Sequence, residues 1–492
     1  MSERAEVGET TRRTAVNVVV RAFAEVLGKI ATLAWTVVVA RVVSQDDFGA
    51  ISYALAVMLI VSALPQWGFD ENVVRRGAAD PRDLPRAYAA ATVWKTAVAV
   101  PIFALTAVAL SFTRPTTESW ICVLLFLLAG FPELWSKTAR SVSVALERPA
   151  STSAALVGQR IVTAVGVLLG ALLGYGIVGV GAGFLAGTVL GWLAHVVAVR
   201  RLGVRSDFGS LDRSDLHVAA RQTAMLGLSA LVLMLLFRLD AVLLEVFKGD
   251  GAVGVYSVAY RLLETTLFVA FAINQAIFPV VSRSPEKWKW SYAFRHAMAI
   301  GGFVYLPFIA VAVFEGQGLI DLLFGAKYAE RGAEILFWLA PAALFYAVAF
   351  FCNALLVAAY DGRALFISSV AATVTNVALN LALIPPFGGV GAGVATVIAY
   401  VVQAGVSVYA LRRAGVELPL VRPLIVPAAA SVALVGVLWA LSLPVLAELL
   451  VGGPVYVVVW AVLARFFAPE QLDVVRSLLT RREPPGVSSA TP

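Results

Sequence analysis

Apolar runs about 20 residues long recur from one end of this 492-residue chain to the other, and a helix of that length spans the ~30 Å hydrocarbon core of a bilayer. Hydrophobic residues make up 60% of the sequence and charged residues 14%, against about 45–50% and 25% in soluble domains. A soluble core cannot bury that excess. The pattern excludes a soluble enzyme, a nucleic-acid-binding domain and a disordered chain, and it leaves transporters, channels and intramembrane enzymes.

Glycine, proline and charged clusters divide the apolar runs and predict an all-α polytopic membrane protein with about fourteen transmembrane helices. The expected spans are residues 15–43, 49–68, 87–110, 119–146, 153–174, 178–199, 223–246, 252–282, 295–315, 333–357, 364–385, 390–411, 424–443 and 449–467. Residues 1–14, 200–222 and 468–492 are expected to be an N-terminal segment, a polar connector and a tail.

The distribution of basic residues between the loops predicts the orientation. Of the 38 Lys and Arg residues, 25 fall in the N-terminal segment, the tail and the loops expected on their side. The other side holds five, namely Arg41, Arg114, Lys248, Lys327 and Arg331. Because cytoplasmic loops are enriched in Lys and Arg, both termini are expected in the cytoplasm and the chain in the cell membrane. The longest outer segment, residues 316–332, is expected to expose Ala329, and Arg114 to lie in an outer loop that tolerates alanine.

Three motifs recur in the same order about 205–212 residues apart. Residues 49–54 read GAISYA and residues 254–259 read GVYSVA, while VGAG occurs at residues 180–183 and again at 390–393. Residues 200–204 read RRLGV and residues 412–416 read RRAGV. An even number of intervening spans keeps the copies in the same orientation. The repeat predicts two parallel six-helix lobes, residues 15–199 and 223–411, related by a pseudo-twofold axis along the membrane normal, with two further C-terminal helices at 424–467.

Charged side chains inside the expected spans are the strongest site candidates, because a charge at the bilayer centre costs at least about 2.5–3.5 kcal/mol and must face protein or water. Eight cations lie there: Arg21, Lys29, Lys95, Lys137, Arg140, Arg160, Arg238 and Arg261. Four carboxylates accompany them: Glu25, Glu133, Asp240 and Glu264. Even with full pairing, positive charge remains in surplus. Such an interior suits anions, phosphates above all.

Pairing within the protein is the alternative role for each of these charges. Helical spacing lets Glu25 reach Arg21 and Lys29, and lets Glu133 reach Lys137, with Arg140 close enough to the helix end to extend into water. Lys95 and Arg160 have no acidic residue at helical spacing in their own spans. In the second lobe, Asp240 is expected to pair with Arg261 across a hairpin, near Arg238 and Glu264.

Motifs for catalysis or metal binding are missing from the sequence. It has no HExxH, no GxSxG and no Cys/His cluster, so we expect no catalytic residues, no metal ligands and no cofactor. Cys122, Cys352 and His195 are expected to be packing residues. The glycine-rich stretches GYGIVGVGAG and GGVGAG precede no Gly-Lys-Ser/Thr, and we expect them to allow close helix packing instead.

Four segments carry a resemblance to a known family: ARVVSQDDFGAISYA (40–54), RLDAVLLEVFKGDGAVGVYSVAYRLLE (238–264), LFGAKYAERGAEILFWLAPA (323–342) and NVALNLALIPPFGGVGAGVATVIAY (376–400). As a set covering about residues 15–415, they resemble bacterial polysaccharide-biosynthesis flippases of the multidrug/oligosaccharidyl-lipid/polysaccharide exporter superfamily.

The resemblance implies a flippase that moves an undecaprenyl-diphosphate-linked oligosaccharide from the inner to the outer leaflet by alternating access. It implies a cationic cavity that holds the diphosphate, and it places Arg21, Lys29 and Arg261 on the spans where such cations are expected. The remaining cations depend on the span analysis alone. Membrane lipids and the glycosyltransferases or polymerase of the same pathway are the further partners implied, and no nucleic acid.

Three other functions remain open. A lipid II flippase would share the fold and the cationic cavity. A drug exporter of the same superfamily would favour acidic residues for its often cationic substrates, the opposite of the surplus here. An intramembrane glycosyltransferase or ligase would display a long external loop bearing catalytic residues, and residues 316–332 carry few of them.

Overall fold

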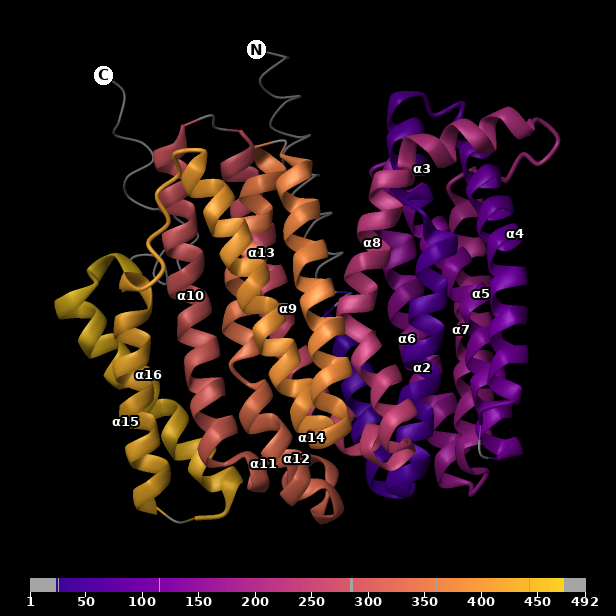
Figure 1. The fold of residues 1–492 in the computed structure, drawn as a ribbon. Coiled ribbons are helices and arrows are strands. Elements are labelled where there is room, and N and C mark those ends of the chain that lie inside the picture. Colours follow the sequence, from indigo (N-terminus) through magenta and orange to yellow (C-terminus); the bar gives the residue numbers. More distant parts are fainter. Residues whose placement is uncertain are drawn as a thin grey trace. The chain divides into compact units, whose positions relative to one another are not determined.

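The computed structural model describes residues 24, 26–114, 116–283, 286–359, 361–441 and 443–472 (Figure 1). Helices make up nearly all of these residues and no strand occurs among them, so the all-α prediction is confirmed. The chain divides into two compact units, Met1–Ser257 and Val258–Pro492. This boundary lies within a helix, whereas the lobes expected from the repeat end at residue 199 and begin again at 223. Those lobe boundaries stay a prediction.

The N-terminal unit consists of a helix over residues 26–42 and the helices that follow it. These are α2 (Gln45–Gln66), α3 (Phe69–Ala79), α4 (Leu84–Ser111), α5 (Thr117–Ala145), α6 (Ala150–Leu172), α7 (Gly176–Arg201), α8 (Arg213–Lys248) and the start of α9 (Asp250–Ser282). The long apolar helices follow the predicted spans. The short helix α3 was not predicted, because its first turn carries Asp70 and Glu71 and the segment has the composition of a loop.

Glycines bring α6 and α7 into backbone contact, as the glycine-rich stretch predicts. A Cβ atom at Gly166 would lie 2.7 Å from the carbonyl oxygen of Gly183, and one at Gly179 would lie 2.8 Å from that of Gly170. Real Cβ atoms do not approach so closely. Small residues at such a contact let two helices pack through their backbones.

A second glycine contact joins the two copies of the repeated motif. Gly49 of α2 and Gly254 of α9 occupy equivalent positions in GAISYA and GVYSVA. A Cβ at Gly49 would lie 3.0 Å from the nitrogen of Gly254, and a Cβ at Gly254 would lie 3.3 Å from the nitrogen of Gly49. The reciprocity is what a contact on a twofold axis produces, although the pseudo-twofold relation of whole lobes stays a prediction.

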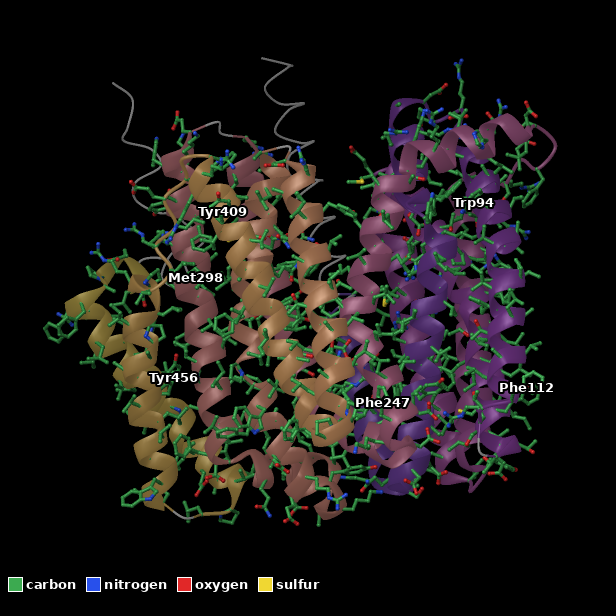
Figure 2. All side chains as sticks on the ribbon, viewed as in Figure 1. Trp94, Phe112, Phe247, Met298, Tyr409 and Tyr456 are labelled. Carbon is green, nitrogen blue, oxygen red and sulfur yellow. The ribbon has the colours of Figure 1, made fainter. Side chains whose placement is uncertain are left out.

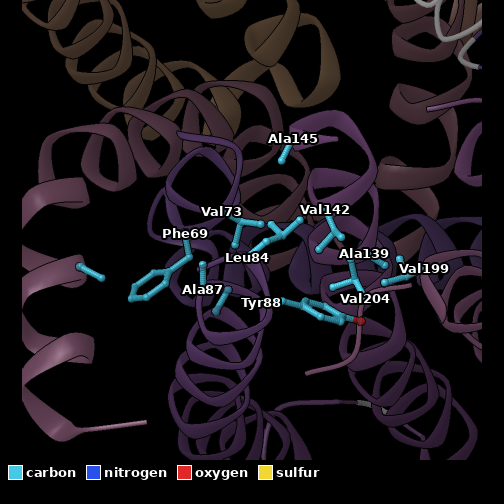
Figure 3. Close-up of a cluster of buried hydrophobic side chains, with 12 residues drawn as sticks. Phe69, Val73, Leu84, Ala87, Tyr88, Ala139, Val142, Ala145, Val199 and Val204 are labelled. Carbon is cyan, nitrogen blue, oxygen red and sulfur yellow. The ribbon is translucent and has the colours of Figure 1, made fainter. Parts of the chain in front are cut away.

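A buried apolar cluster fastens α3 to its neighbours (Figure 3). Phe69 and Val73 of α3 pack with Leu84 of α4 and Val142 of α5, and each is at most 1% exposed. Phe69 also stacks on Trp94 of α4 at 5.0 Å between ring centroids. This cluster holds the first turn of α3, with its carboxylates, against α4 and α5.

The expected polar connector at 200–222 is ordered. Val204 is buried in the same cluster, and the nitrogen of Asp207 donates to the carbonyl of Pro85 at 3.2 Å. α8 begins at Arg213, ten residues before the predicted span, because Asp212 and Asp215 form a capping box there. Asp215 also accepts from Nε of Arg86 at 2.9 Å. The connector is therefore attached to α4 rather than free.

The C-terminal unit begins within α9 and ends with a two-helix hairpin. Its helices are α10 (Lys287–Phe314), α11 (Gly316–Phe324), α12 (Ala326–Leu339), α13 (Ala342–Ala358), α14 (Gly362–Arg413), the 3-10 turn η1 (Arg422–Leu424), α15 (Ile425–Leu441) and α16 (Val445–Phe467). Within α14, Gly388 has φ +56° and ψ −131°, just after Pro385 and Pro386. The backbone is not helical at this point, which lies between the predicted spans 364–385 and 390–411.

The α15–α16 hairpin packs on α10 through aromatic side chains (Figure 2). Tyr456 of α16 donates from its hydroxyl to the carbonyl of Phe303 at 2.7 Å, and Trp460 meets the Phe303 ring edge-on at 4.7 Å between centroids. Tyr456 and Trp460 are each 5% exposed. The three helices therefore share an apolar contact around Phe303.

The prediction that Ala329 is exposed is wrong, whereas the side of the membrane on which residues 316–332 lie stays a prediction. These residues form α11 and the first part of α12, and Ala329 is only 6% exposed. The charges that suggested a loop, among them Glu330 and Arg331, lie on the exposed side of α12 while Tyr328 and Ala329 face inward. An amphipathic helix has the same composition as a polar loop here, but a different order of residues.

Eleven stretches of the described residues are helical, long and apolar enough to cross a membrane, which makes the chain a multi-pass membrane protein. In this count of eleven, α12 and α13 form one continuous stretch, and α14 is one stretch although its backbone is broken at Gly388. The predicted number of about fourteen helices therefore stays a prediction.

Candidate functional site

α5 carries three of the predicted charges along one face. Glu133, Lys137 and Arg140 follow one another at steps of four and three residues, which places them in one stripe of the helix. The hydroxyl of Thr116 caps this helix by accepting from the nitrogen of Ser119 at 3.1 Å. All three charged residues are half-buried. They form the centre of a cluster to which α3, α4 and α6 contribute.

Lys95 of α4 is completely buried, and its three protons are used within the protein. Nζ donates to Oδ1 of Asp70 at 2.5 Å, to Oγ1 of Thr138 at 2.7 Å and to the carbonyl of Leu134 at 3.4 Å. An ammonium group has three donors. Lys95 therefore joins α3, α4 and α5, and it has no donor left for a ligand in this conformation.

Glu133 pairs with α6 rather than with its own helix. Its Oε1 accepts from Nη2 of Arg160 at 3.1 Å, and its Oε2 accepts from Nε2 of Gln159 at 2.7 Å. The expected Glu133–Lys137 ion pair is thus replaced by one between helices, because both carboxylate oxygens are directed toward α6. Arg160, which has no acidic residue at helical spacing, finds its counter-charge on the neighbouring helix.

Lys137, on the same face of α5, has no bonded counter-charge among the described residues. In the part of the chain that the structure describes, Nζ of Lys137 has no hydrogen bond and no ion pair, although Glu133, Arg140, Asp70 and Lys95 are near enough to act on it electrostatically. Asp70 and Glu133 are already bonded to Lys95 and Arg160. A half-buried cation in this position can bind an anion that enters the cluster.

The helix over residues 26–42 lies against the same cluster. A Cβ atom at Gly28 would lie 3.2 Å from Cγ of Arg160, so the glycine leaves room for the arginine stem. Lys29 follows on the exposed side of this helix. Arg21 and Glu25, which the sequence placed on the same stripe, lie outside the described residues.

The predicted ion pair between Asp240 and Arg261 stays a prediction, because the two residues belong to different units of the chain. Asp240 is 1% exposed and accepts from the hydroxyl of Tyr256 and from the nitrogen of Ala241. Arg261, in the C-terminal unit, bonds Oε2 of Glu264 at 2.9 Å, three residues along the same helix. Arg238 is half-buried in the N-terminal unit. Arg261 and Glu264 can bond within α9 because residues three apart on a helix are neighbours.

Arg114, which the sequence placed in a loop that tolerates alanine, is buried in the structure. Its side chain is 1% exposed and bonds Oε1 of Glu245 at 2.8 Å and Oδ2 of Asp250 at 2.5 Å, with its guanidinium 4.6 Å from the centre of the Tyr53 ring. Burial lowers the pKa of Arg114, but Asp250 and Glu245 more than offset that effect and raise it overall. The residue expected to tolerate alanine is the centre of an ion-pair network.

Residues with other chemistry are packed as the sequence indicates. Cys122 and Cys352 are both buried free thiols, and His195 is fully buried with Nδ1 2.8 Å from the carbonyl of Gly191. Among the described residues, no group of three His, Cys, Asp or Glu side chains could hold a metal ion.

Sequence reasoning missed two members of the cluster, Asp70 and Gln159. Asp70 lies in a segment with loop composition, and its role depends on α3 packing beside α4. Gln159 precedes Arg160 on α6, and its amide donates to Oε2 of Glu133 on α5. The signal for Asp70 was Lys95, a cation that required a partner from another helix, whereas an uncharged amide such as Gln159 gave no such signal.

Comparison with known proteins gives the chain its family. The sequence profile of the family described as "Polysaccharide biosynthesis protein" matches residues 15–284, and the MatE profile matches residues 225–382. The probable flippase AglR of Haloferax volcanii is 27% identical over 188 residues, which are 37% of this chain and 39% of AglR. The probable low-salt glycan biosynthesis flippase Agl15 of the same organism is 25% identical over 169 residues, 34% of this chain and 35% of Agl15. Each alignment spans little more than a third of the relative.

A solved structure shares the fold along nearly the whole chain. The lipid II flippase MurJ in an inward closed conformation superposes with a TM-score of 0.74 at 15% identity, covering 91% of this chain and 99% of MurJ. The fold is therefore that of MurJ, and the family profile covers more than half of the sequence. The chain belongs to the polysaccharide biosynthesis protein family of the multidrug/oligosaccharidyl-lipid/polysaccharide exporter superfamily.

Proposed function

We propose that this protein is a flippase that moves a polyprenyl-diphosphate-linked oligosaccharide from the inner to the outer leaflet of the cell membrane for surface polysaccharide assembly. Movement occurs by alternating access of about fourteen transmembrane helices, with both termini in the cytoplasm. Family membership and the names of AglR and Agl15 support the class of activity. Glycosyltransferases or a polymerase of the same pathway supply and use the substrate.

Lys137 is the observation that carries the proposal. It is a half-buried cation on a membrane helix, beside the Arg160–Glu133 pair, and in the described part of the chain nothing is bonded to its ammonium group. Keeping such a charge in a membrane is costly unless it serves a ligand or water. A diphosphate offers several anionic oxygens, and charge-assisted bonds to them are about twice as strong as neutral ones.

The chemistry of the cargo explains why a protein is required. Each sugar hydroxyl taken from water into hydrocarbon costs several kcal/mol, about 4–8 kcal/mol on the cyclohexane scale, so an oligosaccharide does not cross unaided. An inside-negative potential then favours outward movement of an anion by about 2.3 kcal/mol per charge per 100 mV. Direction can therefore come from the potential, without a nucleotide.

The test is substitution of Lys137 in cells that lack the native gene. Lys137→Met removes one charge-assisted contact and should lower surface-polymer output about tenfold or more, while membrane abundance stays near the wild-type value. Lys137→Arg keeps the charge and should restore most of the output. Arg363→Ala, which removes an exposed cation at the start of α14, is the matched control and should leave output unchanged.

Normal output from Lys137→Met would remove the cationic-site part of the proposal. A loss of abundance equal to the loss of output would assign Lys137 to folding instead. Accumulation of lipid-linked oligosaccharide on the inner leaflet, in a variant of normal abundance, distinguishes blocked movement from blocked synthesis.

A lipid II flippase is the second candidate, favoured by the superposition on MurJ over 91% of this chain. Complementation of a strain depleted of its lipid II flippase decides between the two. Growth of that strain would identify lipid II as a substrate, whereas failure together with restored surface polymer supports the first proposal. The MatE profile match also calls for a drug-efflux assay, which we expect to be negative because cationic drugs would meet Lys137.

A further inference from the structure

A cavity of about 370 Å³ opens between α10, α15 and α16, apart from the charge cluster of α5. Cavities that hold small molecules fall in the range of about 300–1,000 Å³. Arg295 and His296 of α10 line it, together with Arg422 of η1 and Glu470 and Gln471 beyond the end of α16. The apolar part of the wall comes from residues of all three helices, namely Ala299, Ile425, Val426, Ala429, Leu463 and Phe467. It is therefore polar at one end and apolar along its side.

Neither arginine at this cavity forms an ion pair or a hydrogen bond through its guanidinium group with the described residues. The one ring contact there is Arg295 above Tyr292 at 5.5 Å, and Nε of Arg295 is buried with no partner in the same part of the chain. Glu470 is the one acidic side chain of the lining. Two forked cations at one cavity match the geometry of a phosphate group.

A buried acceptor faces the same space. Gln471 is 6% exposed, and its Nε2 donates to the carbonyl of Pro423 at 3.1 Å. That bond fixes the amide orientation and leaves Oε1 buried with no donor among the described residues. A ligand that fits must therefore donate a hydrogen bond as well as carry a phosphate.

The cavity lies at the ends of helices long and apolar enough to span a membrane, where the headgroup region is expected. η1 and the beginning of α15 meet the end of α16 here. Trp288, in the first turn of α10, is 54% exposed and has Nζ of Lys289 5.4 Å from its ring centre. Tryptophan and lysine are typical of helix ends at the headgroup level. Ile425 and Phe467 are 57% and 74% exposed, so apolar side chains continue from the cavity to the lipid-facing surface.

We infer that this cavity binds the headgroup of an anionic glycerophospholipid of the phosphatidylglycerol class. With His296 neutral, the lining carries two positive charges and one negative charge, and one phosphodiester neutralises the remainder. The free glycerol hydroxyls donate to Oε1 of Gln471 and to Glu470, and the acyl chains follow Ile425 and Phe467. A phosphatidylethanolamine headgroup has no net charge, so the excess positive charge of the cavity lining would persist. A phosphatidylcholine headgroup has no hydrogen-bond donor for Oε1 of Gln471.

The experiment titrates single lipids onto the purified full-length protein in detergent and counts bound lipids by native mass spectrometry. Wild-type protein should bind phosphatidylglycerol about tenfold more tightly than phosphatidylethanolamine. Arg422→Ala removes an exposed side chain, so folding is preserved, and it should abolish that preference. Arg295→Lys keeps the charge but loses the fork, and it should weaken binding less than Arg422→Ala does.

Arg465→Ala is the matched control, since it removes an exposed cation from the end of α16 that does not line the cavity. The control should keep the wild-type preference, and all variants should unfold at the wild-type temperature in phosphatidylcholine. If Arg465→Ala loses the preference for phosphatidylglycerol as completely as Arg422→Ala does, the lipid is attracted by general surface charge and the inference is overturned. Equal binding of phosphatidylethanolamine, or stronger binding of a polyprenyl diphosphate at this cavity, would overturn it as well. The proposed transport function is not needed for any of these readings.

Discussion

Arg114, in the turn between α4 and α5, donates from Nη1 to Oε1 of Glu245 on α8 at 2.8 Å. Nη2 of the same guanidinium bonds Asp250, the first residue of α9. One side chain therefore connects segments more than 130 positions apart in the sequence.

Arg114→Ala should destabilise the protein by about 3 kcal/mol, because it strands two carboxylates that are partly buried. Thermal unfolding in detergent and membrane abundance measure the effect. Arg114→Lys should recover part of it, since one ammonium cannot serve both acids in the fork geometry. If Arg114→Ala unfolds at the wild-type temperature, the network contributes no net stability.

Arg261→Ala should strand Glu264 and lower membrane abundance. If Arg261 acts only through this pair, the double change Arg261→Ala with Glu264→Gln should restore both abundance and polymer output. If Arg261 also binds substrate, abundance recovers and output does not. Asp240→Asn is the comparison, since Asp240 already bonds Tyr256, and rescue of Arg261→Ala by Asp240→Asn would instead support the predicted pair between Asp240 and Arg261.

Gly166→Ala should destabilise the contact between α6 and α7 by about 1–3 kcal/mol, the usual cost of forcing extra atoms into a packed interface. Gly158→Ala on the same helix is the control, because a Cβ there meets nothing within 4 Å. It should instead stabilise α6 by up to about 1 kcal/mol, the difference in helix propensity. Equal unfolding temperatures for the two variants would argue against close packing.

The proposed orientation predicts labelling by membrane-impermeant thiol reagents in intact cells. A cysteine at Glu330, which is exposed on α12, should react, and one at Asp207, which is exposed in the connector, should not. A cysteine at the neighbouring Ala329 would be unsuitable, because this position is buried and would be protected whichever side of the membrane it faces. Reaction at Asp207 with protection at Glu330 would reverse the orientation.

Glu315 gives the protein a pH-dependent stability. Burial, and then the charge and hydrogen bond of the neighbouring Glu448, raise the pKa of Glu315 above its usual value. Folding therefore favours the protonated form, so the stabilisation is present below the normal pKa of about 4.3 and is lost as pH rises through the higher folded value. Glu315→Gln should flatten this dependence in thermal unfolding measured from pH 4 upward. An unchanged slope would contradict it.

Hydropathy predicted the long helices well, because a helix in lipid must present about 20 apolar residues whatever it packs against. α4 and α5, for example, begin within three residues of the predicted spans. The short helices α3 and α11 escaped prediction because their stability comes from packing, such as Phe69 against Trp94, and not from an apolar length.

The candidate site was predicted as a set of charges but not as a set of pairs. Spacing along one helix suggested that Glu133 would meet Lys137, yet Glu133 meets Arg160 on α6. Pairing between helices depends on how two helices are rotated against each other, which the apolar pattern of each one does not determine. Arg261 and Glu264 show the reverse case, because they bond three residues apart on one helix although the sequence analysis paired Arg261 with Asp240.

The contact between Gly49 and Gly254 brings two main chains together with no side chain between them. No rotamer must be frozen when such a contact forms, and little apolar area is exposed when it separates. Any larger residue at either position would act as a spacer between the first turns of α2 and of α9. The distance between these two turns is thus set by two missing methyl groups, one in each copy of the repeated motif.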